Sequence, residues 1–151
     1  MLKKFITFFK HVLLSYLSIL ITFGILDYIW LGYVAGDFYT DAMQGFLKES
    51  VVVWPWLVFY LMYGFIIFVL AIVPNRVKPW YYSFIDGGLL GAAAYGTYNL
   101  TAYSLVDGFS LSLLLIDWPW GILLTATSAC IGWKVFVLSL NADKASLSLE
   151  E

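Results

Sequence analysis

The chain has 151 residues, of which 62% are hydrophobic and 12% charged, and its formal net charge is −2. Soluble proteins contain roughly 45–50% apolar and ~25% charged residues, and a soluble domain of this length could not bury so much apolar surface. The composition therefore predicts a membrane protein. It excludes disordered, collagen-like, disulfide-rich and nucleic-acid-binding proteins, the last because 8 basic residues are outnumbered by 10 acidic ones.

Four long apolar segments follow one another along the chain and predict four transmembrane helices. They cover about residues 11–34, 52–73, 81–103 and 111–133. At 1.5 Å per residue, about 22 residues cross the ~30 Å hydrocarbon core of a bilayer. We therefore predict an all-α membrane protein, a four-transmembrane-helix bundle that forms one domain over residues 1–140. A polar cytoplasmic tail, residues 141–151, follows it.

Positively charged residues gather on one side of the predicted membrane. Seven of the eight basic residues precede the first segment, join the second to the third, or follow the fourth; they are Lys3, Lys4, Lys10, Arg76, Lys78, Lys134 and Lys144. Only Lys48 lies in the two other connections. Because Lys and Arg are retained on the cytoplasmic side of membranes, this bias predicts that the N- and C-termini are both cytoplasmic.

The connection between the first two segments, residues 36–50, contains apolar residues at roughly helical spacing among charged ones. Phe38, Met43, Phe46 and Leu47 form this apolar set. The pattern predicts a short amphipathic helix on the outer surface, and an ordinary loop is the alternative.

A short repeat opens the second and fourth segments. Trp54-Pro55-Trp56 and Trp118-Pro119-Trp120 both lie at the outer end of a segment that runs inward. The repeat is consistent with two tandem helical hairpins related by an axis along the membrane normal. Chance is the alternative, because interfaces favour tryptophan and the first turns of helices tolerate proline.

Small residues recur along the third segment at four-residue spacing. Gly87 and Gly91 form a G-x-x-x-G pair, and Gly88, Ala92 and Gly96 continue the stripe. Small residues let helix backbones approach closely in lipid, so we expect this segment to lie centrally and to pack against a neighbour in the same chain. A homodimer face is the alternative.

Polar side chains within the segments lie at one depth, near the outer surface. Asp27, Asn99, Thr101 and Asp117 all fall within about 10 Å of the outer end of their segments. An aspartate at the centre of a membrane helix costs about 2.5–3.5 kcal/mol on insertion, and less near an interface. Such residues usually face the interior of the bundle and often mark function.

These polar residues, together with nearby aromatic rings, predict one pocket open towards the periplasm. Its predicted ligand-binding residues are Asp27, Trp30, Tyr95, Tyr98, Asn99, Thr101, Asp117 and Trp120. Asp27 and Asp117 are also candidates for a catalytic acid and base. The alternative is that the polar groups bond one another and lock the bundle together.

The residue types that build metal and redox sites are scarce. The chain has one histidine, His11, and one cysteine, Cys130. They cannot form a multi-histidine metal site or an intrachain disulfide. We therefore predict no metal and no cofactor.

Three motifs carry a resemblance to a known family. Leu26–Gly32 resembles L-D-x-x-W-L-G, Tyr95–Ala102 resembles Y-x-T-Y-D-L-T-N, and Asp117–Gly121 resembles D-x-x-W-G. In this order and spacing, over about residues 1–138, the chain resembles a bacterial family of small four-helix inner-membrane proteins catalogued as a domain of unknown function. The resemblance implies four helices in a bacterial inner membrane and supplies no activity. The aspartate of the second family motif is Asn99 here, and its asparagine is Ala102.

Three functions fit these features. The first is binding or translocation of a lipid headgroup or small amphiphile in the outer pocket. The second is an intramembrane lipid-modifying enzyme that uses Asp27 and Asp117 as acid and base. The third is a structural or accessory subunit of a membrane complex. The expected partners are membrane lipids, a small amphiphilic ligand, and either a second copy of the chain or a larger membrane complex, with no nucleic acid.

Overall fold

The computed structural model describes residues 2–42, 50 and 52–147, and every regular element among them is helical. Helix α1 (Leu2–Ile29) continues as a π-helical turn (Trp30–Val34). A short helix, α2 (Gly36–Ala42), follows it. Helix α3 (Trp54–Ile67) continues through a π-helical turn (Phe68–Ile72) and a 3₁₀ turn (Val73–Asn75). Helices α4 (Trp80–Leu105) and α5 (Leu111–Leu147) complete the chain.

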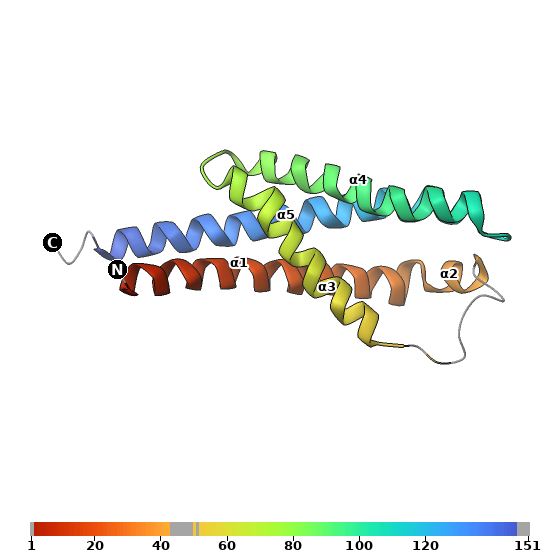
Figure 1. Ribbon diagram of the computed structural model, residues 1–151, viewed down its shortest axis with the longest axis horizontal. Helices are drawn as coiled ribbons and strands as arrows, with labels where there is room; N and C mark the ends of the chain where they lie inside the picture. Colours follow the sequence, from red (N-terminus) through yellow and green to blue (C-terminus); the bar gives the residue numbers. More distant parts are fainter. Residues whose placement is uncertain (1, 43–49, 51, 148–151) are drawn as a thin grey trace.

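The long helices form an elongated bundle in which α3 crosses the others obliquely (Figure 1). Helix α5 contacts both α1 and α4 along their length. The start of α1 and the end of α5 lie at one end of the bundle, and α2 and the connection from α4 to α5 lie at the other (Figure 1). This second end is where the sequence predicts the polar layer.

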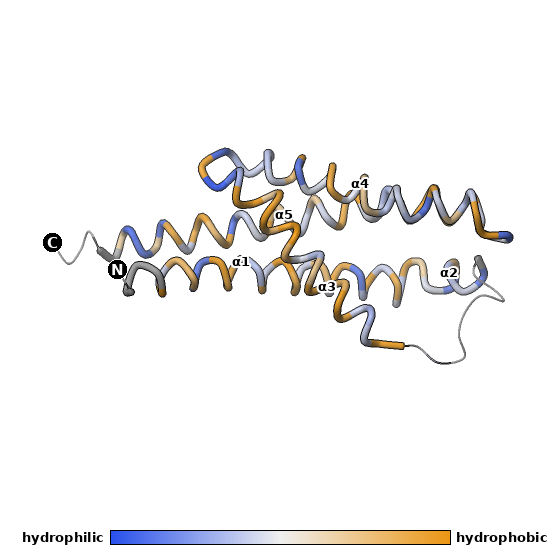
Figure 2. The backbone as a smooth tube through the Cα atoms, viewed as in Figure 1, coloured by the Kyte–Doolittle hydropathy of each residue, from blue (hydrophilic) through white to orange (hydrophobic). Residues whose placement is uncertain are grey.

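Three helical stretches are long and apolar enough to cross a membrane: Ile6–Val34, Trp54–Asn75 and Leu111–Ala145. They correspond to the first, second and fourth predicted segments. Helix α4 has 26 residues, which is sufficient length, but its glycines and polar residues give it a more mixed hydropathy than α3 (Figure 2). The fourth crossing therefore stays a prediction.

Helix α5 is longer than the sequence pattern indicates. It has 37 residues and continues to Leu147, whereas the fourth predicted segment ends near residue 133 and a polar tail was expected from residue 141. The stretch after Trp133 has alanine, leucine and lysine, which favour helix, and contains no glycine or proline that would end it. Pro119, expected in the first turns, lies well inside α5.

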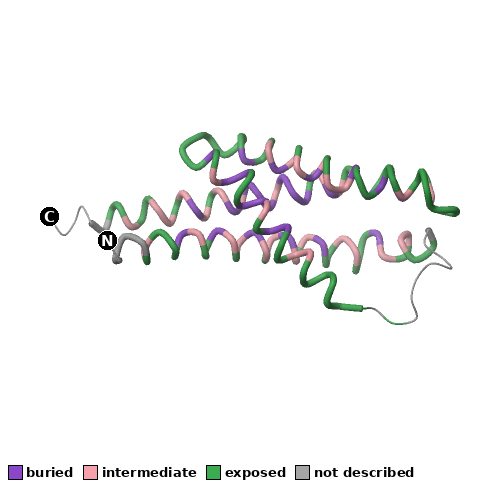
Figure 3. The backbone as a smooth tube through the Cα atoms, in the orientation of Figure 1, coloured by how far each residue is buried: buried purple, intermediate pink, exposed green. Residues whose placement is uncertain are grey.

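The buried core lies where α1, α3 and α5 meet, and the outer faces of the helices are exposed (Figure 3). Its largest members include Ile19 and Phe23 of α1, Ile67 of α3, and Leu124 and Phe136 of α5. Large apolar side chains also cover the outer faces. This distribution suits a helix bundle in lipid, because lipid tails are as apolar as the side chains that face them.

The stripe of small residues on α4 lies against α5. A Cβ atom added at Gly87 would lie 2.6 Å from the Ala129 Cβ atom, and one added at Gly91 would lie 2.5 Å from the carbonyl oxygen of Gly121. Gly96 faces the indole ring of Trp118. Gly88 and Ala92 are only partly buried. The stripe therefore makes close helix contact within the chain.

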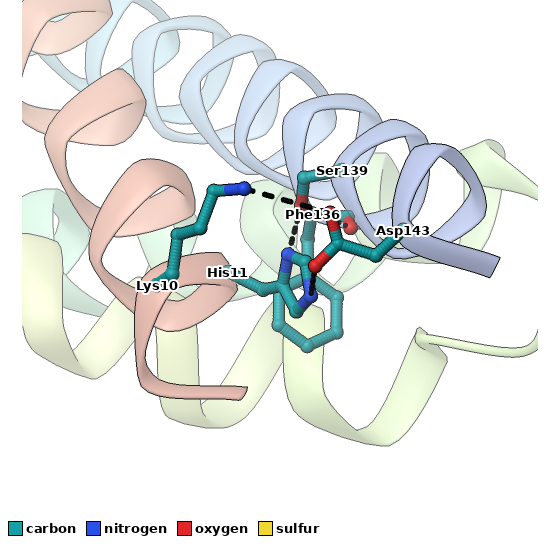
Figure 4. Close-up of polar contacts among 5 residues, drawn as sticks. All are labelled: Lys10, His11, Phe136, Ser139 and Asp143. Carbon is teal, nitrogen blue, oxygen red and sulfur yellow. Dashed lines mark hydrogen bonds and ion pairs between the residues drawn. The ribbon is translucent and has the colours of Figure 1, made fainter. Parts of the chain in front are cut away.

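A polar contact joins α1 to the far part of α5 at the end that carries both termini (Figure 4). The His11 Nδ1 atom lies 2.9 Å from the Ser139 hydroxyl, and its Nε2 atom lies 3.2 Å from an Asp143 carboxylate oxygen. Lys10 lies 3.5 Å from the same carboxylate but is exposed. Because only 1% of His11 is exposed, this pair of contacts fixes the register of α1 against α5.

We expect the substitution His11→Phe to lower the free energy of unfolding by about 1–2 kcal/mol, because it removes both polar contacts of a buried imidazole while keeping a ring of similar size. Thermal unfolding in a mild detergent would measure the loss. The matched control is Lys10→Gln, which removes an exposed ion pair and should cost less than about 0.5 kcal/mol. A larger loss for the Lys10 variant would contradict this assignment.

Candidate functional site

The chain changes direction where α1 ends, and this brings α2 over the end of the bundle. The π-helical turn inserts an extra residue and closes with the Ala35 N–H donating to the Trp30 carbonyl at 2.8 Å. At Gly36 a Cβ atom would collide with the Leu31 carbonyl, so glycine permits the close approach. Helix α2 then contacts α5. It forms the first part of the predicted surface helix, and Met43, Phe46 and Leu47 lie outside the described residues.

Asp117 of α5 accepts hydrogen bonds from two other helices. The Asn99 Nδ2 atom of α4 donates to its Oδ2 atom at 2.6 Å, and the Tyr39 hydroxyl of α2 donates to its Oδ1 atom. Asn99 also donates to the Tyr95 carbonyl at 3.0 Å, so two acceptors define the orientation of its amide. Each carboxyl oxygen of Asp117 thus has its own donor, one from α4 and one from α2.

Tyr39 joins two consecutive hydrogen bonds, one that it accepts from Trp30 and one that it donates to Asp117. The Trp30 indole N–H donates to the Tyr39 oxygen at 3.3 Å, so the Tyr39 hydrogen is left to donate to the carboxylate. Burial and the neighbouring carboxylate raise the pKa of Tyr39 above its ordinary value. The phenol therefore stays protonated and remains a donor at physiological pH.

Asp27 of α1 lies beside this network and bonds to α3. It accepts a hydrogen bond from the Tyr60 hydroxyl at 2.5 Å, and it is close enough to Asp117 and to the Trp120 indole for electrostatic interaction. The indole rings of Trp30 and Trp120 stack with their centroids 4.3 Å apart and nearly parallel, at 6°. The two aspartates predicted to share a layer thus lie in one connected site.

A cavity of about 930 Å³ opens beside these aspartates. Its lining residues come from the first part of α3 and from α1, α2, α4, α5 and the turn after α1. The first part of α3 diverges from the bundle (Figure 1). Both carboxylates line it, with the residues Leu31, Gly32, Gly36, Asp37, Tyr39, Thr40, Pro55, Trp56, Phe59, Tyr60, Ala94, Tyr95 and Tyr98. Such a volume is in the range of small-molecule sites.

The predicted site residues occupy different parts of this region. Asp27, Tyr95, Tyr98 and Asp117 line the cavity. Asn99 is buried behind Asp117, while Trp30 and Trp120 form the stacked pair beside it. Thr101 is not brought to the site: it is exposed and bonds to carbonyl groups of its own helix, those of Thr97 and Tyr98.

Several residues of the cavity are absent from the sequence-based prediction. Tyr39 and Tyr60 hold the two carboxylates, and Trp56 and Phe59 supply further rings. No motif marks Tyr39, because its position depends on the turn that ends α1. Tyr60 lies within an apolar segment, where a tyrosine needs a hydrogen-bond partner for its hydroxyl, and that need is the signal that could have found it.

Two buried polar atoms of the site have no hydrogen bond of good geometry among the described residues. They are the Oδ1 atom of Asn99 and the Nε1 atom of Trp120. Neither residue is part of the cavity lining, and the Trp120 indole lies near the Asp27 carboxylate.

A family described as "Predicted membrane protein (DUF2177)" matches residues 12–134 of the chain. No curated protein and no solved structure matches.

Proposed function

The chain belongs to the DUF2177 family of predicted membrane proteins, and we propose that it binds or translocates a lipid headgroup or small amphiphile in the cavity beside Asp27 and Asp117. The observation that carries the proposal is the cavity itself, which combines buried carboxylates with aromatic and aliphatic walls. A polar centre within apolar walls suits a molecule that has a polar end and an apolar end.

A second hollow supports access from the lipid. It measures about 420 Å³ and lies between α1 and α3, where it is lined by Gly24 and Tyr28 as well as by residues of the main cavity, among them Asp27, Gly32 and Trp56. Trp56 is 52% exposed on the outer face of α3. An acyl chain lying along this face would stay in the membrane while its headgroup enters the cavity.

The proposal includes four membrane crossings and a periplasm-facing cavity. Helices α3 and α5 run in the same direction along the bundle. Helix α4, which lies between them in the sequence, runs in the opposite direction (Figure 1). If α3 and α5 both cross the membrane, the chain returns through α4. The bias of basic residues then favours cytoplasmic termini in a bacterial inner membrane, with the cavity on the other side.

A structural role, alone or as a subunit of a larger complex, is the second candidate. It is favoured by the hydrogen bonds that Asp27 and Asp117 already make to three other helices. A lipid-modifying enzyme would need, in addition, a substrate atom within reach of a carboxylate. Release of a new product from a native lipid extract, lost in Asp27→Asn, is the evidence that an enzyme would require.

Filling the cavity tests the proposed function. A Cβ atom at Gly32 meets nothing within 4 Å, so Gly32→Trp should place its ring in the cavity without disturbing the fold. We expect the lipid that co-purifies in mild detergent, measured by mass spectrometry, to fall about tenfold or more. The matched control is Ile21→Trp on the lipid-facing side of α1, where 60% of the residue is exposed. Equal lipid in both variants at unchanged melting temperature would refute the cavity as the binding site.

A further inference from the structure

The lining of the main cavity is acidic. Asp27, Asp37 and Asp117 contribute to it, and no lysine, arginine or histidine is found among its described lining residues. Buried carboxylates inside a membrane protein are costly unless a positive charge lies near them. Because the described lining supplies no positive charge, a bound ligand can supply it.

Aromatic rings surround the same space. Trp56, Phe59 and Tyr60 come from α3, and Tyr95 and Tyr98 come from α4. The face of an aromatic ring is negative and attracts cations, and clusters of such rings bind ammonium groups. Two independent features, the carboxylates and the rings, therefore favour the same ligand charge.

Two tyrosine hydroxyls that line the cavity already donate to its carboxylates. They are those of Tyr39, which donates to Asp117, and Tyr60, which donates to Asp27. A ligand group that donates hydrogen bonds would meet the carboxylate oxygens of Asp27 and Asp117, while an anionic group would be repelled by them.

We propose, on the basis of the ligand binding argued above, that the group recognised in this cavity is a positively charged nitrogen. It is an ammonium group, carried either by a membrane lipid headgroup or by a free amphiphilic cation. The carboxylates of Asp27 and Asp117 neutralise its charge. The aromatic rings of α3 and α4 pack against the apolar part of the ligand next to it.

Two lipids with identical acyl chains test this selectivity. The full-length protein in a non-ionic detergent is titrated with phosphatidylethanolamine and with phosphatidylglycerol, and binding is followed by native mass spectrometry. Both carry a phosphate, but only the first carries an ammonium group. We expect phosphatidylethanolamine to bind at least about tenfold more tightly, since one cation–π or ion-pair contact in a desolvated site is of that order.

The outcomes separate this inference from the proposed function. Equal or tighter binding of phosphatidylglycerol would overturn the cation inference and leave lipid binding in place. Binding of neither lipid, together with no displaceable lipid in the purified protein, would overturn the proposed function. Dodecyltrimethylammonium, which has no phosphate, should displace the bound lipid, and tetramethylammonium alone should do so only if a free cation is the natural ligand.

Variants connect the selectivity to the named groups. Asp27→Asn keeps an acceptor for Tyr60 but removes the charge, so the preference for phosphatidylethanolamine should fall about tenfold. Asp41→Asn is the matched control, because it removes an exposed charge of the same end of the molecule outside the cavity lining. Trp56→Leu should weaken ammonium binding and Trp56→Phe should retain most of it. An unchanged preference in both Asp27→Asn and Trp56→Leu would refute the assignment.

Discussion

Replacing Gly91 with leucine is expected to lower the free energy of unfolding by about 3 kcal/mol, because the added side chain has no space between α4 and α5. A Cβ atom at this position lies 2.5 Å from the Gly121 carbonyl oxygen and 3.0 Å from the Ile122 Cα atom. Both are backbone atoms, so a rotamer change cannot relieve the contact, and the helices must separate. Titration with sodium dodecyl sulfate from mild detergent micelles would measure the loss.

Gly88→Leu is the matched control on the same helix. A Cβ atom there makes ordinary contacts, 3.7 Å from the Ala126 Cβ and Ile122 Cγ2 atoms, and Gly88 is only partly buried. The leucine can therefore turn towards lipid, and the change should stay within about 1 kcal/mol. Equal losses at Gly88 and Gly91 would show that the α4–α5 contact does not depend on the small residue. A change of oligomeric state in both variants would favour the homodimer alternative.

Local sequence patterns were informative about helices and poor about their ends. Continuous apolar runs predicted the three stretches that are long and apolar enough to span a membrane. The π-helical turns at Trp30–Val34 and Phe68–Ile72 have no comparable signature, because such turns depend on how a helix packs against its neighbours. The sequence pattern places the end of α5 too early. Polar residues make a helix favour water over lipid, but they do not prevent the helix from forming.

The sequence predicts how deep the site residues lie in the membrane, but not the direction in which each side chain points around its helix. Counting residues from the helix ends placed Asp27, Asn99 and Asp117 at one level, and they lie in one connected site. Thr101 shares that level, but it is two residues from Asn99, and two residues turn a helix by about 200°. It therefore faces away. Tyr39 comes from outside the apolar segments, and only the path of the chain after α1 brings it to Asp117.

The substitution Asn99→Asp is expected to lower the free energy of unfolding by about 3 kcal/mol at neutral pH. It places a carboxylate where the amide nitrogen now donates to Asp117 at 2.6 Å and to the Tyr95 carbonyl at 3.0 Å. Two favourable contacts become repulsive, in a position with 0% exposure where water cannot screen them. Asp117→Asn alone should also destabilise, because one of the two oxygens that accept from Tyr39 and Asn99 becomes an amide NH2 group, which cannot accept.

The double variant N99D/D117N decides whether these losses come from the pair. Exchanging the two side chains restores a donor opposite an acceptor between α4 and α5, while the mismatch at the Tyr95 carbonyl remains. We therefore expect partial rescue, with a coupling free energy of at least about 1 kcal/mol in a double-mutant cycle. Simple addition of the two single losses would contradict a direct contact. Two carboxylates at positions 99 and 117 would need a proton or a cation between them. Asn99 removes that need here by donating to Asp117 itself.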